Sequence, residues 1–324
     1  MLHAGILMKT QLLSKKLKYL LLVLIMIPVL YGSGRLYYYI TDGFTIDNIT
    51  SAFPYDSRWA VRPLSSDEQT LAYSILDQKF SYLGKGCQSY VFLSADKKYV
   101  LKFFKYQRFR TQPWVDFFSF IPFVENYLDQ KVVKKRTKRE GFFASWKLAF
   151  EELKEETGLI FVHLNKTQTL QKELIFTDKM GFEHQVELDD MEFLIQRKAT
   201  MLCPYIQSLM KEQKVDEAKK LLSSIISMVL SEYDRGLADN DHALMQNTGV
   251  YNGMPIHIDV GQFVRNEQVR NPETYNQELF NKTFKFRRWL HKEYPELADY
   301  LETELKGILG ELFYTLKPHF KPHD

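Results

Sequence analysis

The chain has 324 residues, which is enough for two domains or for one domain of two lobes. With 45% hydrophobic and 26% charged residues it can build a packed core, and this composition excludes a largely disordered chain. The 43 basic and 40 acidic groups give a net charge of +3, too balanced to indicate nucleic-acid binding, and two cysteines exclude a disulfide framework or a four-cysteine zinc site.

A basic flank precedes an apolar run at the N-terminus. Four lysines lie in residues 1–18, and residues 19–34 (YLLLVLIMIPVLYGSG) carry no charge. This pattern predicts either an uncleaved, single-pass membrane anchor over residues 19–40 or a signal peptide cleaved after Gly34, which would give a secreted protein. A buried core helix is a third reading. We favour the anchor, because the three tyrosines at 37–39 suit a membrane interface. The lysine bias then places the N-terminus in the cytoplasm and the globular part on the far side.

Hydrophobic periodicity and turn residues place the remaining elements in chain order. They predict a helix over 65–80 with Ser66 as its N-cap, strands over 82–93 and 99–104, a helix over 140–158 ended by Gly158, strands over 159–165, 172–177 and 184–199, a long amphipathic helix over 215–236, and two more helices near the C-terminus. A strand-rich half before a helical half indicates an α+β protein of two lobes. The expected divisions are a basic flank (1–18), an anchor segment (19–40), a lead-in (41–81), an N-lobe (82–199) and a C-lobe (200–324).

The stretch GKGCQSYV raises the question of a nucleotide site. It places Gly84, Gly86 and Ser89 in the pattern G-x-G-x-x-S-x-V, and Lys102 lies in the next predicted strand. Glycines in such a turn let backbone N–H groups approach phosphates without a Cβ in the way, and a lysine on a neighbouring strand can reach those phosphates. The alternative to a nucleotide site is an ordinary β-hairpin in which the glycines only ease the turn and the lysine lies on the surface.

A second group of polar residues lies in residues 234–263. Asn247 and Asp259 stand at opposite ends of a predicted hairpin, which brings together an amide oxygen and a carboxylate suited to Mg²⁺. Asp241, in the loop just before, is placed to accept a proton from a hydroxyl nucleophile. Solvated turn residues are the alternative for this segment.

With both groups in this order, the chain resembles the protein-kinase-like superfamily as a remote and atypical member over about residues 82–263. The resemblance implies a two-lobed fold in which Gly84, Gly86 and Ser89 form the glycine-rich loop and Lys102 is the strand lysine. It also implies that Asp241 is the catalytic aspartate, Asn247 the metal-binding asparagine, and Asp259 the aspartate of a D-F-G motif written here as D-V-G. ATP and Mg²⁺ are the implied cofactors.

The chain departs from the pattern of that superfamily in several places. Asp239 and Asn240 replace the usual His-Arg, five residues instead of four separate Asp241 from Asn247, and no A-P-E motif follows Asp259. A short activation segment resembles small-molecule, sugar or lipid kinases more than kinases that grip a peptide. The glutamate expected to pair with Lys102 is one of four in the first-lobe helix, of which we take Glu151; the candidates are Glu140, Glu151, Glu152 and Glu155.

An insert over residues 112–139 joins the lysine strand to this helix. Its first part is apolar and aromatic, and KVVKKRTKR follows with six basic residues in nine. A membrane-facing amphipathic segment has this composition, and a buried insert with a solvated basic start is the alternative. The basic run is too short and local to favour a nucleic-acid partner.

These observations predict a membrane-anchored, kinase-like protein that binds a nucleoside triphosphate with Mg²⁺ and transfers its γ-phosphoryl group to a hydroxyl acceptor of unknown identity. A pseudokinase that serves as a membrane-tethered scaffold is the alternative, favoured by the altered loop around Asp241 and by the shortage of ATP outside the cytoplasm. A second alternative is an α+β interaction domain with no nucleotide site.

Overall fold

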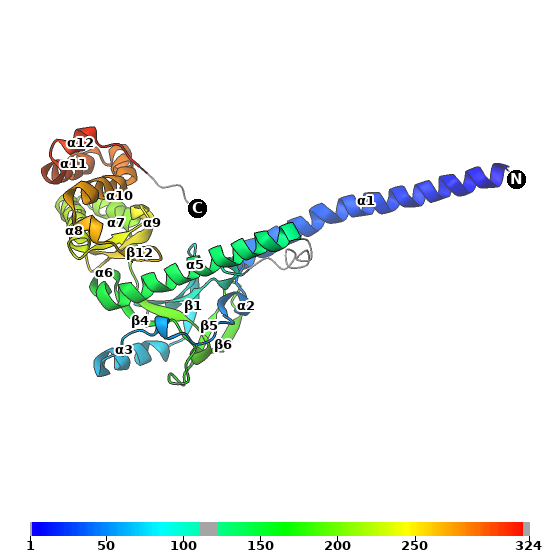
Figure 1. Ribbon diagram of the computed structural model, residues 1–324, viewed down its shortest axis with the longest axis horizontal. Helices are drawn as coiled ribbons and strands as arrows, with labels where there is room; N and C mark the ends of the chain where they lie inside the picture. The colour runs from blue at the N-terminus through cyan, green and yellow to red at the C-terminus, as the bar shows by residue number, and fades with distance from the viewer. Residues whose placement is uncertain (1, 111–121, 320–324) are drawn as a thin grey trace.

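The computed structural model describes residues 2–110 and 122–319, and these form two lobes with a long helix leaving one of them (Figure 1). The N-lobe is built around a sheet and the C-lobe is mostly helical, so the predicted α+β, two-lobed, kinase-like fold is confirmed. Short 3-10 helices connect several elements: η1 (Ser57–Trp59), η2 (Tyr106–Arg108), η3 (Leu188–Asp190) and η4 (Glu267–Arg270).

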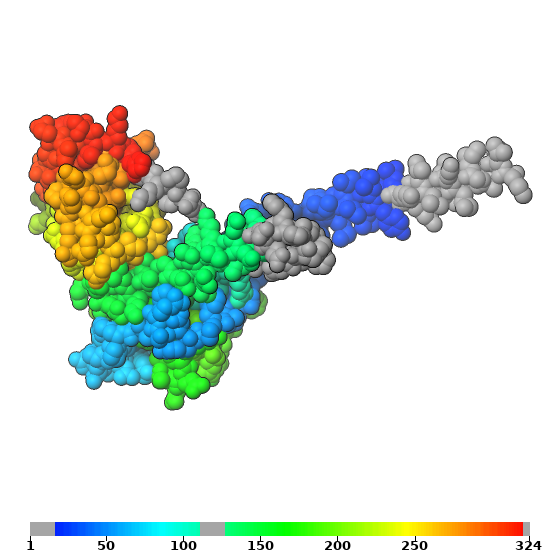
Figure 2. Space-filling model, viewed as in Figure 1, coloured from blue at the N-terminus to red at the C-terminus, as the bar shows by residue number. Residues whose placement is uncertain are grey.

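Helix α1 (Leu2–Thr41) leaves the N-lobe as a long rod (Figure 1), and the space-filling view shows that its part nearest the lobe projects from the surface (Figure 2). Within the described residues, Leu17–Thr41 is the one helical stretch long and apolar enough to cross a membrane, and no residue of its apolar 18-residue window is buried against protein. The predicted apolar N-terminal helix is therefore confirmed. Its length and composition suit a membrane anchor and a signal sequence alike.

The N-lobe sheet has seven strands in the order β4-β7-β3-β2-β1-β5-β6, antiparallel throughout except where β1 runs parallel to β5. The strands are β1 (Phe80–Lys85), β2 (Ser89–Ser94), β3 (Tyr99–Phe104), β4 (Leu159–His163), β5 (Glu173–Thr177), β6 (Glu183–Glu187) and β7 (Phe193–Arg197). Successive side chains of β7 alternate between two cores, with Phe193 and Ile195 in one and Leu194 in the other, as the period of two in a strand requires.

Helices cover both faces of this sheet. The short α2 (Ile46–Ile49) and α3 (Ser66–Leu76) pack on one face, and α5 (Pro122–Glu152), followed by α6 (Lys154–Thr157), packs on the other. Gly158 ends α6 with a φ of +61°, as its predicted role as a C-cap requires. Residues 112–121 of the predicted insert lie outside the described residues, and the rest of it forms the N-terminal part of α5.

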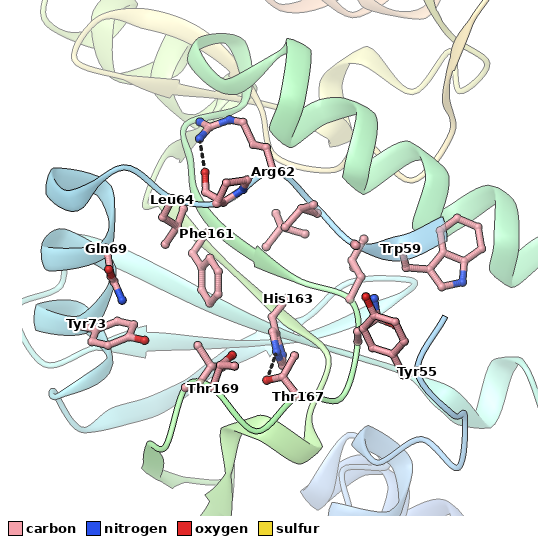
Figure 3. Close-up of a pocket in the computed structure, with 17 residues that line it drawn as sticks. Tyr55, Trp59, Arg62, Leu64, Gln69, Tyr73, Phe161, His163, Thr167 and Thr169 are labelled. Atoms are coloured by element: carbon pink, nitrogen blue, oxygen red, sulfur yellow. Dashed lines mark hydrogen bonds between the residues drawn. The ribbon is translucent and has the colours of Figure 1, made fainter. Parts of the chain in front are cut away.

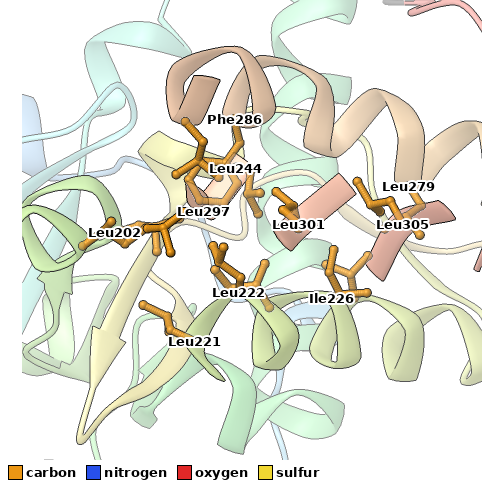
Figure 4. Close-up of a cluster of buried hydrophobic side chains, with 14 of the residues drawn as sticks. Leu202, Leu221, Leu222, Ile226, Leu244, Leu279, Phe286, Leu297, Leu301 and Leu305 are labelled. Atoms are coloured by element: carbon orange, nitrogen blue, oxygen red, sulfur yellow. The ribbon is translucent and has the colours of Figure 1, made fainter. Parts of the chain in front are cut away.

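The C-lobe core lies between four helices: α7 (Leu202–Lys211), α8 (Val215–Asp234), α10 (Pro272–Glu293) and α11 (Pro295–Leu309). Figure 4 shows Leu222 and Ile226 of α8 facing Leu301 and Leu305 of α11. Apolar residues at i, i+3, i+4 and i+7 line one face of α8, which confirms the amphipathic helix predicted there. The remaining C-lobe elements are α9 (Leu244–Asn247), α12 (Leu312–Thr315), β8 (Thr200–Met201), β9 (Leu237–Asp239), β10 (Thr248–Tyr251), β11 (Met254–His257) and β12 (Phe263–Arg265).

Two local predictions need correction. The strand predicted over residues 82–93 is a hairpin: β1 ends at Lys85 and β2 begins at Ser89, with a β-bulge between Tyr82 and Gly84. The N-cap of α3 is Ser65 rather than Ser66, because Ser65 and Glu68 form a reciprocal capping box, with Ser65 N donating to the Glu68 carboxylate over 2.9 Å.

Candidate functional site

The turn between β1 and β2 has its carbonyl oxygens tied back to the chain that follows β3. Gly86 O accepts a hydrogen bond from Lys105 Nζ over 2.6 Å, and Gln88 O accepts one from Lys105 N over 2.9 Å. The Arg108 guanidinium donates to Cys87 O. Three successive carbonyl groups are thus held by donors from residues 105–108, a role that the sequence had not predicted for Lys105 or Arg108.

The N–H groups of the same turn are less satisfied. Within the described part of the chain, the backbone N–H groups of Cys87 and Gln88 have no hydrogen-bond acceptor, whereas Gly86 N donates to Ser89 O over 2.9 Å. Neither Gly84 nor Gly86 has a positive φ, and a Cβ at either position would meet at most one atom, 4.0 Å away. The fold does not require glycine there, so the absence of side chains leaves the backbone accessible to a ligand.

Lys102 lies in the middle of β3 and points toward the C-lobe. Its ammonium donates to Ile258 O, next to Asp259, and lies 5.6 Å from the centre of the Trp146 ring. Burial lowers the pKa of Lys102 to about 8, and the nearby Asp259 carboxylate opposes this shift. Among the described residues, no carboxylate forms an ion pair with Lys102.

The prediction that Glu151 pairs with Lys102 is wrong. Glu151 accepts a hydrogen bond from Arg62 N over 3.3 Å, on the outer surface of the lobe. Two other candidates also pair with arginines: Glu140 with Arg58 and Glu152 with Arg265. The face of α5 toward the sheet is aromatic, and Trp146 is the residue that it presents to Lys102.

The predicted hairpin of the C-lobe forms and brings its two ends together. β10 pairs with β11, and Ile258 N donates to Asn247 O over 2.8 Å. Asp259 is half-buried just beyond β11, and Gly261 N donates to its carboxylate over 3.2 Å. Burial raises the pKa of Asp259, Lys102 lowers it, and the charges of two neighbouring aspartates, 239 and 241, raise it further. Burial therefore disfavours the charged form of the Asp259 carboxylate, and a bound cation would stabilise that form.

Asp241 is held by its neighbours in the loop. Its carboxylate accepts a hydrogen bond from Asn247 Nδ2 over 3.0 Å and another from Ala243 N over 3.0 Å. Its own N–H donates to Asp239 over 3.0 Å. Asn247 is the last residue of α9, a single helical turn, and its side chain reaches back to Asp241 across the five residues between them.

The glycine-rich turn contacts the D-V-G segment directly. A Cβ at Gly261 would lie 2.7 Å from Gln88 Oε1 and 3.0 Å from the Phe142 ring, so this position accepts only glycine without a shift of its neighbours. The structure therefore brings the turn, Lys102 and Asp259 to one place between the lobes. Gln88 and Trp146 belong to this site although no sequence pattern indicated them.

A separate cavity of about 360 Å³ lies on the N-lobe between α3 and β4 (Figure 3). Two of its polar side chains have partners: His163 Nδ1 lies 2.7 Å from Met191 O, and Arg62 pairs with Glu68. These groups stabilise the fold, and none of them belongs to the nucleotide-type arrangement. No group of three or more His, Cys, Asp or Glu side chains that could hold a metal occurs within residues 17–110 and 127–319.

Comparisons with known proteins do not place the chain in a family. No protein-family model matches the chain, and no curated protein matches it. One solved structure that does match is that of the bifunctional kinase-methyltransferase WbdD, with 13% sequence identity and a TM-score of 0.33. The match covers 68% of this chain and 43% of that one, so less than half of that protein's length is represented.

The fold is kinase-like. This statement depends on the two-lobed α+β architecture, with the seven-stranded sheet and α5 in one lobe and the helical core in the other.

Proposed function

We propose that this chain is a membrane-anchored, kinase-like protein that binds Mg-ATP and transfers the γ-phosphoryl group to a hydroxyl acceptor. The observation that carries the proposal is the turn between β1 and β2: its carbonyl groups are tied back, and among the described residues the N–H groups of Cys87 and Gln88 have no acceptor. The Gln88 side chain of this turn lies against Gly261, two residues after Asp259, and Lys102 donates to Ile258 O, the residue before Asp259. Backbone donors and an ammonium group in such an arrangement suit the phosphates of a nucleotide. Helix α1 serves as the anchor in this proposal.

The roles of the site residues follow from their chemistry. The turn and Lys102 position the phosphates, and Asp241 accepts the proton of the acceptor hydroxyl as its oxygen bonds to the γ-phosphorus and the bond to the β-phosphate oxygen breaks. Asn247 and Asp259 supply the oxygen ligands that Mg²⁺ prefers, and the raised pKa of Asp259 fits a carboxylate awaiting a cation. The metal, when bound, neutralises charge on the phosphates.

A pseudokinase scaffold is the second candidate, and two contacts favour it. First, the Asn247 amide donates a hydrogen bond to Asp241, so it is already engaged within the loop. Second, Lys102 contacts Ile258 O and the Trp146 ring at the place where an active kinase has a glutamate. Transfer of labelled phosphate from ATP distinguishes an enzyme from a scaffold, whereas nucleotide binding alone does not.

Thermal melting of the full chain in a neutral detergent, with and without Mg-ATP, tests the nucleotide site. A ligand at 100 times its Kd stabilises the fold by about 2.7 kcal/mol, which corresponds to a rise in Tm of roughly 2–4 °C for a domain of this size. We expect this rise to require Mg²⁺ and to disappear in Lys102→Ala and Asp259→Ala. The exposed Lys98→Ala is the matched control and keeps the shift. If the wild-type chain shows no shift, the α+β interaction domain without a nucleotide site becomes the better description.

The affinity for Mg-ATP is expected to fall at alkaline pH. Lys102 has a pKa of about 8 in the free protein, so its ammonium is lost above that pH, while bound phosphates favour the charged form. The Kd at pH 9 should therefore be about tenfold higher than at pH 7. Isothermal titration calorimetry at both values measures this change.

Lys102→Gln is the control for the pH dependence. Lys105 also has its pKa lowered to about 8 by burial, and only the contribution of Lys102 disappears in this variant. Lys102→Gln should bind more weakly at pH 7 and lose most of the dependence. An equally steep dependence in the variant would assign the effect to Lys105.

A further inference from the structure

The N-terminal half of α5 carries a stripe of lysines on one face. At about 100° per residue, Tyr127, Lys131, Lys134, Lys135 and Lys138 fall within a sector of about 100° around the helix axis. The acidic residues Asp129 and Glu140 lie on the opposite side of the helix. Lys131 Nζ lies 5.1 Å from the centre of the Tyr127 ring, and no acidic side chain in the described parts of the chain pairs with Lys131, Lys134 or Lys138. Lys131, Lys134 and Lys138, which are exposed, together with Tyr127 are called the lysine stripe below.

The stripe lies on a part of α5 that extends beyond the sheet. Lys135 donates to Arg110 O, and Arg110 in turn donates to Asp47 and to Thr50 O over 2.7 Å. Asp47 belongs to α2, only a few residues after α1 ends at Thr41. The base of the extended part is thus fixed beside the base of α1. From there α5 continues toward Pro122 for about 20 Å, toward the side on which α1 leaves the lobe (Figure 1).

The junction between α1 and the N-lobe contains no flexible linker. The Asp42 carboxylate accepts a hydrogen bond from Tyr82 over 2.9 Å and forms ion pairs with Lys85 and Lys179, each at 3.1 Å. Phe44, two residues later, also fixes the end of α1 to the N-lobe, because its side chain is buried in the core of that lobe. A lobe held this closely to the end of a membrane helix keeps α5 near the membrane surface.

We propose that the lysine stripe binds the headgroups of anionic lipids in the bilayer that holds α1. The inference rests on the anchor part of the proposed function and does not require phosphoryl transfer. Each lysine that reaches an anionic surface contributes about fivefold to the partition coefficient, and a tyrosine at the end of the stripe suits the interface. A lipid surface is favoured over a polynucleotide because the stripe is short and lies on the side from which the anchor emerges.

The test measures how readily each lysine reacts with a neutral acylating reagent in the full chain reconstituted into nanodiscs. The discs contain phosphatidylcholine alone or phosphatidylcholine mixed with phosphatidylglycerol, and mass spectrometry reports the acylation of individual lysines. We expect the acylation reactivity of Lys131, Lys134 and Lys138 to fall by a factor of about five or more in the anionic discs. High salt should restore their reactivity, since the contact is electrostatic. The exposed lysines Lys97, Lys98 and Lys211 serve as internal references and should not change.

Paired variants test whether the stripe itself carries the contact. The triple variant K131Q/K134Q/K138Q should lose the effect of anionic lipid on the fluorescence of a dye attached at Gln130→Cys, whereas K97Q/K98Q/K211Q, with the same change in charge, should keep it. Unchanged stripe reactivity in a chain that resists alkaline extraction would overturn the proposal, and protection by a polynucleotide in neutral discs would replace it with nucleic-acid binding. A chain that alkaline extraction releases would instead contradict the anchor on which the proposal rests. This test does not measure nucleotide binding or phosphoryl transfer, so a failure of those parts of the proposed function would not change its result.

Discussion

Asp259→Ala is expected to lower Mg-dependent phosphoryl transfer by at least about 100-fold, because removing a group that stabilises charge at the reacting phosphate commonly has an effect of this size. Asp259 is the carboxylate beside Lys102, and burial raises its pKa although the Lys102 ammonium opposes this shift. The measurement is Mg-dependent release of ADP or transfer of labelled phosphate, at saturating ATP and with each acceptor class tested in turn.

The same substitution should leave stability unchanged or raise it. A carboxylate whose pKa is raised by burial is destabilised in its charged form, so its removal relieves an unfavourable contact in the ligand-free protein. Loss of turnover with an unchanged or higher Tm would therefore mark Asp259 as a functional residue and not a structural one. The exposed Asp190→Ala is the matched control and should retain full turnover. Turnover that persists in Asp259→Ala would refute the metal-binding role.

Much of the fold could be predicted because it depends on local patterns. The alternation of apolar residues predicted most strands of the N-lobe, and the i, i+3, i+4 pattern predicted α8 almost to its ends. The turn at Gly253 predicted the C-lobe hairpin, whose pairing places Thr248 opposite His257. These signals act over a few residues, so one sequence is sufficient to detect them.

The errors arose where contacts between distant residues decide the structure. The sequence predicts one strand where β1 and β2 form a hairpin, because apolar residues continue on both sides of the turn, and only pairing in the sheet shows the reversal. Which glutamate faces Lys102 depends on the rotation of α5 against the sheet, and Trp146 occupies that place. The Ser65 N-cap could have been predicted, since Ser65 and Glu68 have the spacing of a capping box.

The site itself was predicted only in outline. Lys102 and Asp259 were chosen because of their order along the chain, and the structure places them together. The tie between the glycine-rich turn and Lys105 could not be predicted, because a lysine after a strand has no preferred partner in sequence. Gln88 was missed for the same reason: its contact with Gly261 exists only because the two lobes meet.

Lys282→Met is expected to destabilise the protein by about 3–5 kcal/mol, because it leaves a buried carboxylate without its partner. Lys282 Nζ lies 2.8 Å from the Asp239 carboxylate, and each side chain is only 3% exposed. This pair joins α10 to β9, and Asp239 also accepts the hydrogen bond from Asp241 N. Asp239 therefore supports the loop that carries the proposed catalytic aspartate, where the kinase pattern has a histidine.

Urea denaturation of the single and double variants separates the pair from its surroundings. Asp239→Asn combined with Lys282→Met removes both charges, so it should recover a large part of the stability that Lys282→Met loses, since replacing a whole buried pair by neutral groups is often nearly neutral. Lys292→Met breaks an exposed pair with Glu293 and should change the unfolding free energy by no more than about 0.5 kcal/mol. A loss in Lys282→Met as small as that in Lys292→Met would show that Asp239 is solvated or protonated in the native state.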